Sequence, residues 1–209
     1  MKDRVLKRLM AAMLIGVCLS TGVLAQTAKT QEKTKSISPT AEITRFFIEA
    51  AQKGSGYETG PLHIIYSDGT EIVEKLPPLR ASTKKETVFN AVGFSGVYLA
   101  EDRQTLGWTI NVQNCCTSYF IPLSLVVFRH KHVLHSFDQG RMVWTWMFLQ
   151  GGEHVAVVFG PVHGDAGGDY QLYDVKTGKL ISEAWGDDDT QPLKPNAPEW
   201  AKRLQDHNK

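Results

Sequence analysis

The sequence predicts a mainly β protein of antiparallel, blade-like sheets, arranged as an incomplete propeller or a small sandwich. Two observations lead to this fold class. Between residues 62 and 185, short segments with an apolar period of two alternate with turn-forming residues, which is typical of antiparallel strands. Within this region, similar strand–turn–strand segments occur twice. One amphipathic helix before the region and a short helix after it complete the predicted fold.

The N-terminus has the parts of a secretory signal. Basic residues come first, an uncharged apolar run covers residues 9–24, and Ala25 ends a cleavage pattern before Gln26. The apolar run is shorter than the roughly 20 residues that a membrane span requires. We therefore expect residues 1–25 to be cleaved and the mature protein to be periplasmic or secreted. An uncleaved N-terminal anchor is the alternative.

Composition and charge narrow the function classes. The 23 basic and 22 acidic residues of the chain nearly balance, and removal of the signal leaves a slight acidic excess. Such a balance predicts no binding to nucleic acid. No second apolar run is long enough to span a membrane, and 209 residues suit a single domain. The sequence contains no nucleophile, phosphate-loop or zinc-protease motif, and no cofactor is expected.

The mature chain begins with a polar segment and a predicted helix. Residues 26–37 are rich in Lys and Thr and contain almost no apolar residues, which predicts a disordered tether. Ser38 and Pro39 then suit the N-cap and first position of a helix. Apolar residues follow at helical spacing as far as Gly54. We expect this amphipathic helix to open a single β-rich domain over residues 38–205.

Two short elements can be assigned from local signals. Residues 62–76 contain two β-rich segments around Asp68 and Gly69, a dipeptide that favours a hairpin turn. At the other end of the domain, residues 195–205 predict a short helix that starts at Pro198.

The segments between these elements form two similar units. Residues 97–110 can be aligned with residues 146–159, and residues 124–137 with residues 170–185. Each unit is expected to have four strands: two around a polar turn, a longer loop, and two more.

Parts of these units resemble known blades. AEDRQTLGW resembles the strand–turn–strand element of TolB-type and WD-type propellers, and LYDVKTGKL is similar to their outer hairpin, with an Asp-x-x-Thr-Gly-Lys turn. Closed propellers need about four or more blades, so the resemblance implies an incomplete one. NCCTSYFIP, VWTWMFLQGGEHVAVVFGPVHGD and YQLYDVKTGKL together resemble a group of exported bacterial proteins without an assigned function. That resemblance implies export and a blade-like fold, and no activity.

Cys115 and Cys116 are redox candidates. Neighbouring side chains in a regular strand point to opposite faces, and adjacent Cα atoms lie only about 3.8 Å apart, below the usual disulfide range of about 4.4–6.8 Å. A bond between them therefore requires a distorted turn, which the neighbouring Asn114 and Pro122 favour. Two buried thiols, a metal site and an intermolecular bridge remain alternatives.

The glycine-rich loop 160–170 is the most site-like connection. It carries His163, Asp165 and Asp169 among four glycines, and glycine permits close approach of a ligand. The carboxylates could bind Ca²⁺ or support a hydrolase. The alternative is a turn in which aspartate hydrogen-bonds its own backbone.

Aromatic and histidine side chains supply two further candidates. Trp144 and Trp146 alternate with one residue between them, so we expect them on one face, as core or as a platform for a sugar ring or apolar ligand. His130, His132 and His135 could bind a transition metal, or lie exposed in a hairpin turn.

These observations favour a non-enzymatic, exported binding or interaction module of the cell envelope. Its partner would be a protein or a small molecule, and exposed sheet edges make a homodimer plausible. The alternative is a redox-active or metal-dependent protein built on Cys115 and Cys116.

The mass of the exported protein tests the signal and the cysteines together. We expect a chain that begins at Gln26, because the cleavage pattern ends at Ala25. Without reductant, a bonded cysteine pair is lighter by two hydrogens and takes up no alkyl groups under denaturing conditions. Two thiols take up one alkyl group each. A mass that still includes residues 1–25 would contradict the signal prediction.

Overall fold

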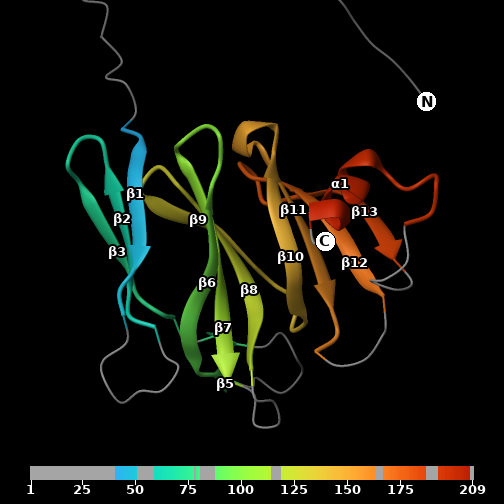
Figure 1. Ribbon diagram of the computed structural model, residues 1–209, viewed down its shortest axis with the longest axis horizontal. Coiled ribbons are helices and arrows are strands. Elements are labelled where there is room, and N and C mark those ends of the chain that lie inside the picture. The colour runs from blue at the N-terminus through green and yellow to red at the C-terminus, as the bar shows by residue number, and fades with distance from the viewer. Residues whose placement is uncertain are drawn as a thin grey trace, which may run out of the picture. The chain divides into compact units, whose positions relative to one another are not determined.

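The chain is mainly β, as predicted, and its strands form antiparallel sheets (Figure 1). The computed structural model describes residues 41–50, 59–77, 79–80, 88–113, 119–162, 167–186 and 193–207. The predicted signal and tether lie outside these residues.

Eleven of the strands form three sheets, each in sequence order. The first sheet contains β1 (Ile43–Ile48), β2 (Leu62–Tyr66) and β3 (Glu71–Glu74). The second sheet contains β6 (Ala91–Leu99), β7 (Thr105–Gln113), β8 (Phe120–Arg129) and β9 (His132–Asp138). The third sheet contains β10 (Met142–Leu149), β11 (His154–Gly160), β12 (Gly168–Asp174) and β13 (Leu180–Gly186), with a 3₁₀ turn η1 (Gln150–Gly152) after β10.

The smaller elements are a strand pair and a helix. β4 (Leu79–Arg80) pairs with β5 (Val88–Phe89), and α1 (Glu199–His207) is the C-terminal helix. The helix predicted over residues 195–205 is therefore confirmed, as is the hairpin predicted over residues 62–76. The four segments aligned in the sequence are hairpins in the second and third sheets. Their assignment to propeller blades stays a prediction.

The predicted N-terminal helix is wrong where the structure describes it, because residues 43–48 form strand β1. Ile43, Phe46 and Ile48 all pack into the core beside the first sheet. The pairing register with β2 shifts between Ile43 and Arg45, so a β-bulge moves the alternation by one residue. The bulge gives a strand the i, i+3 spacing that predicts a helix. The β-branched and aromatic residues of this segment favour a strand.

Three apolar clusters hold the elements together. The first lies between the first and second sheets and includes Ile64 and Trp108. The next lies between the second and third sheets and includes Val127 and Phe159. The last lies between the third sheet and α1 and includes Leu204. Because the second sheet is covered on both faces, β7 and β8 are almost continuously buried.

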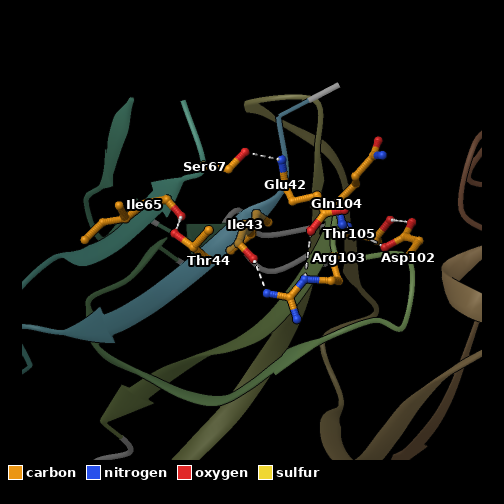
Figure 2. A network of polar contacts seen from close by, with 9 residues as sticks. All are labelled: Glu42, Ile43, Thr44, Ile65, Ser67, Asp102, Arg103, Gln104 and Thr105. Atoms are coloured by element: carbon orange, nitrogen blue, oxygen red, sulfur yellow. Dashed lines mark hydrogen bonds and ion pairs between the residues drawn. The ribbon is translucent and has the colours of Figure 1, made fainter. Parts of the chain in front are cut away.

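One turn, residues 100–104 between β6 and β7, is organised by an aspartate (Figure 2). The carboxylate of Asp102 accepts hydrogen bonds from the backbone N–H groups of Gln104 and Thr105, both at 2.9 Å. It also accepts the Thr105 hydroxyl proton at 2.6 Å and pairs with Arg129 at 3.3 Å. The carboxylate therefore satisfies backbone donors that the sharp turn leaves without strand partners.

The same turn contacts the first and third sheets. The backbone N–H of Ile43 donates to the Arg103 carbonyl at 2.7 Å, and the Arg103 guanidinium pairs with Glu42 at 3.0 Å (Figure 2). On the other side, the backbone N–H of Asp102 donates to the Gly151 carbonyl in η1 at 3.2 Å. The turn therefore fixes β1 and the end of β10 relative to the second sheet.

A bulge in β10 separates the two tryptophans that were expected on one face. The pairing register with β11 shifts between Val143 and Thr145, so Trp144 is the extra residue. Trp146 consequently joins the cluster between the second and third sheets, and Trp144 packs on the opposite side with the cluster beneath α1. The prediction of a shared face is wrong for this reason.

Trp144 lies against glycines of neighbouring strands. Its indole N–H donates to the Pro161 carbonyl at 3.2 Å. A Cβ atom on Gly160 would lie 2.1 Å from Trp144 Cε2, and a Cβ atom on Gly168 would lie 3.2 Å from its Cζ3. The ring fits beside Gly160 only because that position has no side chain, and a side chain at Gly168 would press on its edge.

We expect Gly160→Ala to destabilise the protein by about 1–3 kcal/mol, the usual cost of overpacking a core, because the methyl group overlaps the Trp144 ring. Urea unfolding measures the loss. In a Trp144→Ala background the same substitution should cost clearly less, since the overlapping ring atoms are gone. An equal loss in both backgrounds would contradict this packing.

Candidate functional site

The strongest candidate site is a groove between β6 and β10, which we call the edge groove. Two adjoining cavities of about 340 and 230 Å³ form it, and they share Tyr98, Trp146 and His207. β6 is an edge strand of the second sheet and β10 an edge strand of the third. The groove is therefore bordered by two strand edges.

An aromatic pair lies at the middle of the groove. The Tyr98 side chain is 51% exposed, whereas Trp146 is only 4% exposed. Their rings meet edge to face, with centroids 5.2 Å apart, and Trp146 meets Phe148 in the same way at 5.2 Å. Trp146 therefore supports Tyr98 from behind, and Tyr98 is the ring that a ligand meets.

A bulge in β6 determines which side chains face the groove. The register with β7 shifts between Ser95 and Tyr98, and Gly96 has a φ of 54°. Glycine adopts this backbone conformation at little cost. Phe94 and Val97 pack toward the first sheet, so the bulge places both Ser95 and Tyr98 toward the third sheet.

The fit of Trp146 depends on a glycine in β7. A Cβ atom on Gly107 would lie 2.5 Å from Trp146 Cη2. The indole occupies that space between the second and third sheets. A side chain at position 107 would therefore displace the Trp146 ring that packs behind Tyr98.

Hydroxyl groups line the larger cavity. Ser95 Oγ and Thr109 Oγ1 lie 2.8 Å apart, and Ser95 Oγ donates to Asn111 Oδ1 at 3.0 Å. Thr109 Oγ1 donates to the Ser95 carbonyl at 3.0 Å. Such hydroxyls can exchange a partner within the protein for a ligand hydroxyl, since each can both donate and accept.

Charged groups line the smaller cavity. Glu101 follows Tyr98 at the β6–β7 turn, and Arg203 comes from α1. His207, also from α1, places its ring 6.5 Å from Tyr98 between the two cavities. The groove therefore offers an exposed aromatic face at its centre, hydroxyls on one side and a pair of opposite charges on the other.

The shape of the two edges favours a compact ligand over a peptide strand. β6 is bulged at Gly96 and β10 at Trp144, and both positions line the larger cavity. A bulge interrupts the regular alternation of backbone donors and acceptors that an added strand needs.

The structure describes Asp169 and does not describe the other candidates of the cysteine pair and the glycine-rich loop. Cys115 and Cys116 fall in the connection between β7 and β8 and, with His163 and Asp165, lie outside the described residues. Asp169 is in β12, where Arg141 pairs with its carboxylate.

The tryptophan candidates both border the edge groove. Trp144 and Trp146 line its larger cavity from the edge of β10, although their rings pack on opposite sides of the third sheet. They do not form one platform.

The three predicted histidines lie around the β8–β9 hairpin. His130 and His132 are exposed beside the turn, with His132 Nδ1 3.0 Å from the His130 carbonyl. The His135 ring lies beside Phe137, 5.9 Å between centroids. Across the described part of the chain, no group of three or more His, Cys, Asp or Glu residues could hold a metal ion.

One histidine with carboxylate partners lies elsewhere, on the outer face of the first sheet. His63 Nδ1 lies 2.7 Å from Glu71 Oε1 and Nε2 lies 3.4 Å from Glu49 Oε2, and the ring stacks on Phe47. The hydrogen bond with Glu71 raises the pKa of His63, although desolvation opposes it. These contacts tie the three strands of the first sheet together.

Sequence reasoning missed the residues that define the groove, namely Ser95, Tyr98, Thr109 and His207. One local signal near them was not used: Gly96 directly precedes the predicted segment 97–110, and an isolated glycine in a strand often marks a bulge. Their convergence depends on contacts between strands far apart in the chain.

No model of a known protein family matches the sequence, and no curated protein is significantly similar to it. Within the residues described above, no helix is long and apolar enough to cross a bilayer.

Proposed function

We propose that this protein is an exported, non-enzymatic binding module of the cell envelope, and that its edge groove binds a small polyhydroxylated ring such as a sugar residue. The observation that carries the proposal is the half-exposed Tyr98 ring, backed by buried Trp146 and flanked by hydroxyl groups.

A sugar ring matches this arrangement chemically. It has a face of C–H groups that stacks on an aromatic ring, and a rim of hydroxyls that both donate and accept hydrogen bonds. Tyr98 supplies the stacking face, and Ser95 and Thr109 supply partners for the rim. The larger cavity, about 340 Å³, falls within the range of about 300–1,000 Å³ typical of small-molecule pockets.

A binding role suits the groove better than catalysis. Nucleophilic catalysis needs a hydroxyl or thiol within hydrogen-bonding reach of a base. The hydroxyls of Ser95 and Thr109 instead contact each other, Asn111 and a backbone carbonyl. Export is supported by the predicted signal at residues 1–25.

The redox or metal-dependent alternative rests on Cys115 and Cys116 in the sequence alone. It stays a prediction, and alkylation of the denatured protein decides whether these residues are bonded.

Saturation-transfer NMR with N-acetylglucosamine, glucose and mannose tests the proposal. We expect transfer to the ring C–H protons of at least one sugar. Tyr98→Ala should weaken that sugar's affinity by about fivefold, the usual worth of an aromatic stacking contact.

Tyr119→Ala is the matched control, because Tyr119 is 49% exposed, almost as much as Tyr98, and does not line the groove. It should leave sugar binding unchanged. Absence of transfer to all three sugars, or an equal loss in both variants, would overturn the proposal.

A further inference from the structure

The edge groove is longer than a single sugar ring. Its two cavities follow the same order along both bordering strands. Ser95 on the β6 side and Val143 on the β10 side line the larger cavity, whereas Glu101 and Leu149 line the smaller one. The stretch of β10 from Val143 to Leu149 spans up to roughly 20 Å, at the usual strand rise of about 3.3 Å per residue. The groove is therefore elongated and has two compartments.

The two cavities meet at Tyr98 and His207. Both residues line both cavities, and their rings lie 6.5 Å apart at an angle of 71°. Tyr98 comes from β6 and His207 from the end of α1, so these side chains border the groove where one cavity passes into the other. A ligand that fills the larger cavity and continues past this point enters the smaller one.

The volumes of the cavities suit a ligand that occupies both. The larger cavity, about 340 Å³, lies at the lower end of the range of about 300–1,000 Å³ for small-molecule pockets, and the smaller one, about 230 Å³, lies below it. Together the two cavities fall well within that range. Each compartment alone is suited to one ring.

The smaller cavity has polar groups of its own for a second ring. Glu101 and Arg203 both line it and are both exposed. Among the described residues neither forms an ion pair, with the other or with a third side chain. The carboxylate can therefore accept, and the guanidinium donate, charge-assisted hydrogen bonds to a ligand. A sugar hydroxyl does both. Because the two charges balance, this cavity suits a neutral ring better than an ion.

We propose that the edge groove binds two linked sugar rings, one in each cavity, and that Glu101 and Arg203 bind the second ring. The inference rests on the proposed sugar-binding function and specifies its ligand as a neutral disaccharide or a longer chain of sugar residues. The first ring meets Tyr98 and the hydroxyl of Ser95 in the larger cavity. The linkage between the rings passes His207.

Calorimetric titration of the mature chain compares each monosaccharide with its disaccharide: N-acetylglucosamine with diacetylchitobiose, glucose with cellobiose and maltose, and mannose with mannobiose. We expect at least one disaccharide to bind about tenfold more tightly than its monosaccharide, the usual worth of one hydrogen bond to a charged group. Arg203→Ala and Glu101→Ala should each remove most of this preference, because each substitution removes a partner of the second ring.

Lys202→Ala is the matched control. Lys202 precedes Arg203 on α1, lines neither cavity and donates to the Pro195 carbonyl at 2.8 Å. Its substitution removes the same charge and should leave the preference intact. A protein that binds a monosaccharide, and no disaccharide more tightly, would overturn the inference and leave the sugar-binding function standing. Binding of no sugar at all would overturn both. An equal loss of preference in Lys202→Ala and Arg203→Ala would contradict the role given to Arg203.

Discussion

The turn between β6 and β7 is the constraint on which the rest of the structure depends. The Asp102 carboxylate closes the turn through Gln104 and Thr105, and the turn's backbone then bonds to β1 through Ile43 and to η1 through Gly151. A few hydrogen bonds thus fix three sheets against one another at one end. Because Tyr98 lies just before this turn, the same contacts set the position of the proposed binding ring relative to β10.

A bulge and a glycine determine which side chains line the edge groove. Regular alternation would put Ser95 and Tyr98 on opposite faces of β6, and the bulge at Gly96 puts both toward β10. Gly107 leaves the space that Trp146 fills behind Tyr98. The edge groove therefore lies between two strand edges, β6 of the second sheet and β10 of the third.

Local signals in the sequence were sufficient for the hairpins and insufficient for the site. Asp174 accepts hydrogen bonds from the backbone N–H and hydroxyl of Thr177, and Asp102 does the same with Thr105, so this short motif forms a turn at both places. The predicted N-terminal helix and the shared tryptophan face failed for one reason. A bulge shifts the alternation of side chains between the two faces of a strand, and the position of the bulge depends on the partner strand. The groove could not be predicted because its walls meet only through tertiary packing.

Comparison of two matched turns tests the central role of Asp102 most directly. Asp102→Ala and Asp174→Ala each remove the carboxylate of an Asp-x-x-Thr turn, and urea unfolding measures both. We expect a loss of about 2 kcal/mol for Asp102→Ala, since two part-buried backbone donors and Arg129 lose their partner. We expect a clearly smaller loss for Asp174→Ala, because the hydrogen bonds of that carboxylate to Thr177 are exposed to solvent. Equal losses in the two variants would contradict a central role for Asp102.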